Sequence, residues 1–155
     1  MSESVADRFR RRPDSHETVS GTFELQVDFA AEVTVGEETV VLEQELPTLD
    51  SAVVGEAVAP VVEEGWEETF ERRVADVTGV VDPVAGPTVT VDGETVRIRM
   101  ELRAEDRDVT EQVRHAADFV ETTWVEGIIP GYDYDEQVQQ IRNRAMETGG
   151  SDGPP

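Results

Sequence analysis

One pattern that occurs twice constrains the fold of this chain more than any other feature. Residues 33–46, Val-Thr-Val-Gly-Glu-Glu-Thr-Val-Val-Leu-Glu-Gln-Glu-Leu, align without a gap on residues 89–102, Val-Thr-Val-Asp-Gly-Glu-Thr-Val-Arg-Ile-Arg-Met-Glu-Leu. Apolar and polar residues alternate on both sides of a tight turn in each copy, which is the pattern of a β-hairpin. A stretch with helical periodicity follows each copy, so the sequence predicts two similar hairpin-helix units. Duplication and convergence on a common hairpin pattern both explain the similarity.

A second constraint comes from the charge of the chain. Its 155 residues include 35 Asp and Glu but only 13 basic residues, for a formal net charge of -22, and every basic residue is Arg. Such a surface repels itself in dilute buffer, whereas at molar salt the electrostatic screening length falls to roughly 3 Å. The acidic excess, with Arg in place of Lys, therefore indicates a halophilic protein of a salt-rich cytoplasm. The alternative interpretation is an ordinary acidic protein that its charge keeps soluble.

The sequence lacks the residues and motifs of several functional classes. It contains no Cys, which excludes disulfides, thiolate metal sites and a cysteine nucleophile. It also lacks a Gly-rich phosphate loop, a His-Glu-x-x-His motif and a dinucleotide fingerprint, so we predict no catalytic residue, no metal and no cofactor. No apolar run approaches the roughly 18 residues of a membrane span, and we expect a cytoplasmic protein that binds no membrane.

Alternating apolar residues predict three strands ahead of the first long helix, over about 22–29, 31–35 and 39–46, and the last two of these form the first hairpin. The predicted fold class is α+β: an antiparallel sheet of four to five strands with two packed helices, in the order α-βββ-α-ββ-α, plus a short C-terminal helix over 134–147. The predicted division is a polar N-terminal segment at 1–20, a single α+β domain at 21–133, and a short helix with a disordered tail at 134–155.

Two longer helices complete the predicted core. The first starts near Ala59 and places an apolar residue at every fourth position, and the second runs over 108–126 and ends at a glycine cap. Gly65 lies inside the first helix and weakens its pattern, because glycine is a poor helix former. We interpret Trp66 and Phe70, on the apolar side of this helix, as core residues rather than as a ligand cage.

A row of three Arg residues is the most distinctive polar feature of the predicted folded part. Arg97, Arg99 and Arg103 share the polar face of the last predicted strand. Such a row suits contact with an anionic ligand. The simpler alternative is cross-strand pairing with Glu43 and Glu45 or with their neighbours.

Two other charged groups allow both a functional and a structural interpretation. The Arg-rich run at 8–12, within a predicted two-turn helix, suits contact with nucleic acid, but the net charge favours pairing with the protein's own carboxylates. Glu111, His115 and Asp118 share a solvated helix face at a spacing that suits a divalent metal. Because such sets arise commonly by chance, we predict no metal site there.

The segment after the second helix, Gly-Ile-Ile-Pro-Gly-Tyr-Asp-Tyr-Asp at 127–135, combines apolar, aromatic and acidic residues. A surface segment of this kind is typical of docking to a partner protein. The candidate docking residues are Trp124, Ile128, Ile129, Tyr132, Asp133 and Tyr134. Alternatively, Tyr132 and Tyr134 fold back over the end of the helix, and their hydroxyls find partners at its rim.

Three runs of the chain resemble a known family. They are Leu-Pro-Thr-Leu at 46–49, Val-Glu-Glu-Gly-Trp at 62–66 and, above all, Val-Glu-Gly-Ile-Ile-Pro-Gly-Tyr-Asp-Tyr at 125–134. They are similar to a small family of uncharacterised haloarchaeal proteins, a domain of unknown function, over most of residues 20–136. The resemblance implies a haloarchaeal cytoplasm and brings no activity. The order of elements is also similar to the secretion-chaperone-like fold, whose members often form homodimers and bind partner segments, a likeness of topology alone.

Three functions are compatible with these observations. The favoured one is a non-enzymatic protein-binding or adaptor module, a homodimer in our expectation, whose docking surface includes residues 124–134 and one sheet edge. The alternative is a small-ligand-binding or enzyme domain with an Arg-lined site. A regulator that contacts nucleic acid through the run at 8–12 is disfavoured by the net charge.

The charge argument predicts that folding depends on salt. Far-ultraviolet circular dichroism should show the fold in molar KCl and its loss below about half-molar KCl, because the carboxylates then repel one another over longer distances. Full secondary structure in dilute buffer would contradict the halophilic interpretation.

Overall fold

The computed structural model describes the backbone of residues 4–152 and the side chains of residues 4–144. Within this range the strands are β1 (Ser15–Val19), β2 (Thr22–Leu25), β3 (Ala31–Val35), β4 (Thr39–Pro47), β5 (Ala85–Asp92) and β6 (Thr95–Arg103). The α-helices are α1 (Val5–Arg11), α2 (Leu49–Ala52), α3 (Pro60–Val74), α4 (Val109–Glu126) and α5 (Glu136–Asp152). A 3-10 helix, η1 (Ala75–Gly79), continues from the end of α3.

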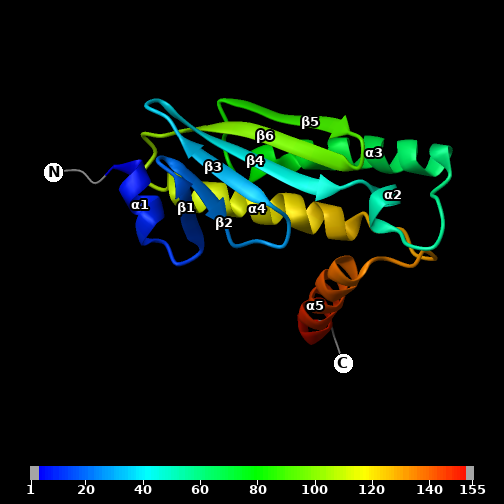
Figure 1. The fold of residues 1–155 in the computed structure, drawn as a ribbon. Coiled ribbons are helices and arrows are strands. Elements are labelled where there is room, and N and C mark those ends of the chain that lie inside the picture. Colours follow the sequence, from blue (N-terminus) through cyan, green and yellow to red (C-terminus); the bar gives the residue numbers. More distant parts are fainter. Residues whose placement is uncertain (1–3, 153–155) are drawn as a thin grey trace.

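All these strands belong to one antiparallel sheet, in the order β1-β2-β3-β4-β6-β5. Figure 1 shows α4 running beneath this sheet, with α1 at the left, α3 at the right and α5 below α4. Helices α3 and α4 pack against each other, and α4 contacts the central strands β4 and β6. The predicted class, α+β with a single antiparallel sheet, is therefore confirmed.

Alternation along the strands creates one apolar face, which the helices cover. Every second residue is buried along the central strands, from Val40 to Leu46 in β4 and from Val96 to Leu102 in β6. The side chains of α4 that are completely enclosed are Val109, Val113, Ala116, Ala117, Val120 and Trp124. Gln44 is the polar exception on this face, since it is fully buried and neither atom of its amide has a partner in the described part of the chain.

The two copies of the repeated pattern form the hairpins β3-β4 and β5-β6, which lie side by side because β4 pairs with β6. Glu43 and Arg99 occupy equivalent positions in the aligned copies, and the β4-β6 register pairs them directly with each other. An approximate two-fold axis therefore passes through this pair and relates the two hairpins. The helices that follow the hairpins, α3 and α4, meet on the same covered face.

Strand β1 raises the sheet to six strands, whereas the sequence predicts four to five. Its residues, Ser-His-Glu-Thr-Val, show no apolar alternation because an edge strand of this sheet buries none of its side chains fully. It follows α1, whose N-cap residue Ser4 accepts a hydrogen bond from the backbone N–H of Asp7 at 3.1 Å. Phe9 of α1 is buried and its ring lies 5.4 Å from that of Phe23. Residues 5–19 thus extend the sheet and its core.

The boundaries of the long helices agree with the local sequence signals. Helix α3 begins with a proline directly after Ala59, and α4 begins directly after Asp108 and ends at Glu126, as predicted. Helix α5 continues past its predicted end at residue 147 and includes two glycines. The low helix propensity of glycine is only a weak determinant of where a helix ends. Of the predicted disordered tail, residues 149–152 are helical, and residues 153–155 lie outside the described range.

Candidate functional site

Two aromatic residues of the predicted docking segment are buried. The indole of Trp124 is fully enclosed, and its Nε1 donates a hydrogen bond of 2.9 Å to the backbone oxygen of Pro47. Tyr134 is only 2% exposed, and its hydroxyl accepts a hydrogen bond from the backbone N–H of Ile129 at 3.1 Å and donates one to the Ile129 carbonyl. Burial raises the pKa of Tyr134. Neither ring is available to a partner in this conformation.

The same segment ties the end of α4 to α2. The backbone N–H of Val54 donates to the carbonyl of Asp133 at 2.8 Å, and the N–H of Asp135 donates to the carbonyl of Ala52 at 2.9 Å. Ile128, Ile129 and Tyr132 are half-buried against the core, while Asp133 is exposed. The structural alternative, in which Tyr134 folds back over the helix end, describes this geometry.

The Arg row on the open face of the sheet is paired with carboxylates of the same chain. Arg97 forms the expected cross-strand ion pair with Glu45 at 2.9 Å. Arg99 instead pairs with Glu101 on its own strand at 3.0 Å. Arg103 approaches Asp82 at 3.8 Å. All three guanidinium groups are substantially exposed, so each pair adds little stability.

The N-terminal Arg run also pairs with carboxylates of the protein. Arg10 bonds to Asp7 at 2.6 Å and to Glu17 at 2.8 Å. Hydrogen bonding to Arg10 lowers the pKa of Glu17 to about 2. Arg10 therefore pairs with the protein's own carboxylates, as the structural interpretation predicts.

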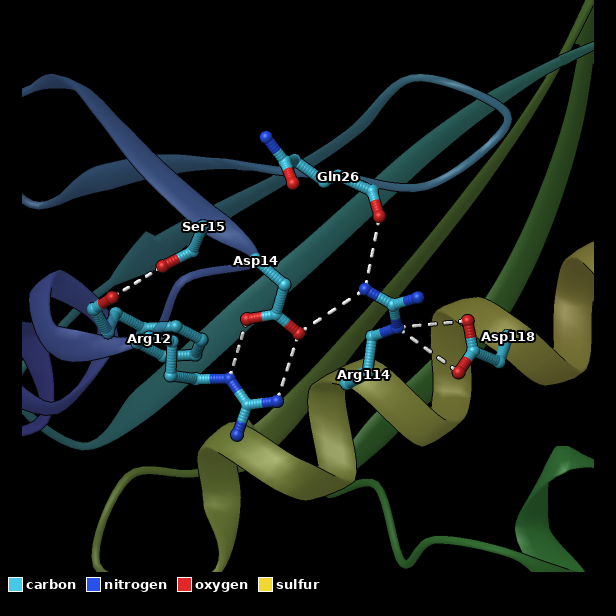
Figure 2. A network of polar contacts seen from close by, with 7 residues as sticks. Arg12, Asp14, Ser15, Gln26, Arg114 and Asp118 are labelled. Carbon is cyan, nitrogen blue, oxygen red and sulfur yellow. Dashed lines mark hydrogen bonds and ion pairs between the residues drawn. The ribbon is translucent and has the colours of Figure 1, made fainter.

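Figure 2 shows the polar network that joins this N-terminal part to α4. Arg114 of α4 donates from Nε to both carboxylate oxygens of Asp118, at 3.0 and 3.1 Å. Its Nη1 reaches Asp14 at 3.2 Å and the backbone oxygen of Gln26 at 3.0 Å. Arg12 donates to both carboxylate oxygens of Asp14, at 2.9 and 3.0 Å, and this hydrogen bonding lowers the pKa of Asp14. The network fastens α1, β1 and the loop after β2 onto α4.

A polar cleft of about 660 Å³ lies beside this network, between β1, β2, the loop after β2, α4 and α5. Glu121 lines it with a side chain that is 8% exposed, and its Oε2 accepts a hydrogen bond of 2.6 Å from the backbone N–H of Phe29. Burial raises the pKa of Glu121 to about 7, and the charges of Asp28 and Asp118 add to the increase. The group therefore exchanges its proton near neutral pH.

The charges around this cleft already satisfy one another to a large extent. Arg144 bonds to Asp28, and Asp118 is held by Arg114. His115, with Glu111 and Asp118, was the candidate metal set, but no group of three or more such side chains is arranged to hold a metal ion within the described residues. The first pair joins α5 to the loop after β2, and the second lies within α4.

An apolar groove of about 350 Å³ lies between α3 and the C-terminal end of α4. Apolar, small and hydroxyl side chains make up most of its wall. The lining residues are Val61, Val62, Gly65, Trp66, Thr69, Phe70, Arg73, Thr123, Gly127 and Ile129. Ile129 is the member of this set that the sequence named as a docking residue.

Two glycines leave the space of the groove unfilled. A Cβ at Gly65, inside α3, would meet no heavy atom within 4 Å. A Cβ at Gly127, at the end of α4, would lie 3.5 Å from Nε1 of Trp66 and 3.4 Å from the backbone oxygen of Trp124. Neither residue has a positive φ, so backbone conformation does not require glycine at either position.

Trp66 forms the inner wall of the groove and belongs to the core at the same time. It is 5% exposed, stacks on Phe70 with ring centroids 5.3 Å apart, and meets Trp124 edge-on at 6.3 Å. The interpretation of Trp66 and Phe70 as core residues is thus confirmed, although both also line the groove. Nε1 of Trp66 donates no hydrogen bond to any described residue, in contrast to Nε1 of Trp124.

The rim of the groove is acidic on its α3 side. Glu64 and Glu68 of α3 are exposed, and each follows a lining residue, Val61 or Gly65, by three positions, so it lies beside that residue on the helix surface. On the α4 side, the exposed Glu126 bonds to Arg73, the one basic residue of the lining, so these two charges offset each other. The negative charge of the rim therefore lies with the two glutamates of α3.

This groove was not among the candidate sites that the sequence predicted. It depends on the space left between two helices, which no local pattern reveals. The one sequence feature at its position was Gly65, within an otherwise regular helix, and the structure shows that Val61, an apolar residue of the same helix, is 74% exposed. Both positions lie on the α3 side of the groove.

The fold and its surfaces define an α+β protein built from two hairpin-helix units, with an apolar groove between the helices of those units. The chain belongs to a family of unknown function (DUF5813), whose model matches residues 4–144. The resemblance to an uncharacterised domain of unknown function is thereby confirmed, and the match includes α1 and β1. No curated protein and no solved structure matches the chain. In the described part of the chain, no helix is both long enough and apolar enough to cross a membrane.

The raised pKa of Glu121 predicts how stability changes with pH. Between its ordinary value of 4.5 and about 7, the folded protein keeps a proton that the unfolded chain has lost. The free energy of unfolding therefore falls as the pH rises through this window, by about 1–3 kcal/mol. Glu121→Gln, whose amide oxygen still accepts the Phe29 N–H, should lose this decrease.

The measurement is urea unfolding in molar KCl at several pH values across the window for both proteins. Parallel pH profiles for wild type and Glu121→Gln would contradict the assignment.

Proposed function

We propose that this protein is a non-enzymatic protein-binding module of a halophilic cytoplasm, and that the groove between α3 and α4 holds a segment of its partner. The partner segment presents an aromatic or branched apolar side chain next to Arg or Lys residues. The observation that carries the proposal is an apolar groove, left open by Gly65 and Gly127, beside a well-packed aromatic core.

The other candidate surfaces support a binding role less well. The Arg row and the charges of the polar cleft have partners within the chain. The groove, in contrast, has apolar walls that no described side chain covers. A site of this kind gains affinity from apolar burial, since enclosing one large apolar side chain contributes about 1.5–3 kcal/mol.

The acidic rim decides the charge of the partner. Glu64 and Glu68, on the α3 side of the groove, favour basic residues next to the apolar anchor. In molar salt the screening length is roughly 3 Å, so direct ion pairs at the rim contribute while long-range attraction does not. Arg suits such pairs because its guanidinium binds a carboxylate through two parallel hydrogen bonds.

A peptide-display selection in molar KCl tests this function. The protein is presented to a library of short random peptides, and the enriched peptides are then measured against a variant with a filled groove, Gly65→Leu. Leucine is a good helix former, and a Cβ at Gly65 meets no heavy atom within 4 Å. Gly79→Leu is the matched control, because Gly79 also has open space around it and lies outside the groove.

We expect the enriched peptides to share an apolar anchor next to Arg or Lys. They should bind wild type and Gly79→Leu alike, and bind Gly65→Leu at least about tenfold more weakly, a difference of about 1.4 kcal/mol. A selection without enrichment, or peptides that bind Gly65→Leu as tightly as wild type, would overturn the proposal.

A further inference from the structure

We infer that the groove recognises a peptide group together with the apolar side chain next to it, with Nε1 of Trp66 as donor to the peptide carbonyl. This inference rests on the proposed function and specifies the partner segment. Because the carbonyls inside a helix are already hydrogen-bonded, the segment that enters the groove is extended or forms a turn.

The first observation is the state of the two indole N–H groups. Trp124, the deeper of the two tryptophans, donates to Pro47 at 2.9 Å. Trp66 is 95% enclosed, given its exposure of 5%, yet its Nε1 has no acceptor among the described residues. This nitrogen is not among the fully buried polar atoms that lack a partner, so it keeps some exposure to solvent. It lies 3.5 Å from the position that a Cβ on Gly127 would occupy. The donor therefore opens into the groove.

The second observation is a hydroxyl on the facing helix. Thr123 of α4 is 5% exposed and lines the groove, and its hydroxyl makes no hydrogen bond to a described residue. A hydroxyl both donates and accepts. The groove thus offers a fixed donor on α3 and a hydroxyl on α4, and a peptide group carries the matching acceptor and donor.

The energetics favour an occupant with an acceptor. Solvent has access to the Trp66 N–H in the open groove, and an occupant of the groove would exclude that solvent. A purely apolar occupant leaves the donor buried without a partner, whereas an occupant with a carbonyl restores the hydrogen bond. We expect this difference to favour the carbonyl-bearing occupant by about tenfold in affinity.

The two tryptophans make a nuclear magnetic resonance experiment decisive. The ¹⁵N-labelled protein gives one indole signal for Trp66 and one for Trp124, and Trp66→Phe assigns them. The probe is N-acetyl-leucine N-methylamide, which carries a branched side chain between two peptide groups. Isopentylammonium, with the same branched chain and no carbonyl, is the comparator, and because the acidic rim favours its positive charge, tighter binding of the neutral amide does not come from charge. Both are titrated in molar KCl to about 0.1 M, where a ligand of millimolar affinity saturates its site.

We expect the amide to move the Trp66 indole proton downfield, to slow its exchange with water, and to leave the Trp124 signal in place. The amide should bind about tenfold more tightly than the ammonium comparator. Thr123→Val, which keeps the shape of the side chain, should weaken the amide about fivefold and leave the comparator unchanged. Gly65→Leu should abolish both sets of shifts.

The remaining outcomes separate the two proposals. If both probes shift the backbone signals of the groove residues but the Trp66 indole signal does not move, the carbonyl inference is overturned and the binding function stands. If neither probe nor any selected peptide perturbs the groove, both proposals are overturned.

Discussion

The structure depends on one constraint: the sheet has one apolar face, and the helices that follow its hairpins in the chain have to cover that face. The pairing of β4 with β6 meets this constraint, because it places the two hairpins around the Glu43–Arg99 pair and brings α3 and α4 onto the same face. Helix α4 fills the centre with small and branched side chains, and Trp124 joins it to the end of β4. The other face keeps its charges in water.

The groove follows from the same arrangement. Helices α3 and α4 meet where α4 ends, and the chain beyond it is held against α2 by Tyr134 and its neighbours, which leaves Ile129 at the edge of the gap. Gly65 and Gly127 add no side chain that would close it. Trp66 then serves two roles, since one face of its ring packs in the aromatic core while its N–H faces the open space.

The sequence predicted the parts of the fold that local patterns determine. The two hairpins and the limits of α4 follow from alternation, helical period and flanking residues, and the structure has them as expected. Strand β1 escaped prediction because its pairing, rather than its own composition, makes it a strand. The docking role predicted for residues 124–134 stays a prediction, and tertiary packing buries Trp124 and Tyr134 of that segment. The groove is the space left between two packed helices, and the sequence of either helix alone does not predict it.

The most direct test concerns Gly65. In this account, glycine at position 65 leaves the groove open at the expense of helix stability. Glycine inside a helix is less favourable than alanine by roughly 0.5–1 kcal/mol. The measurement is the free energy of unfolding of wild type and Gly65→Ala in urea and molar KCl. We predict that Gly65→Ala is more stable by about that amount, since the added Cβ meets no atom within 4 Å. A variant less stable than wild type would show that the packing of α3 requires glycine, and would contradict the explanation given for the groove.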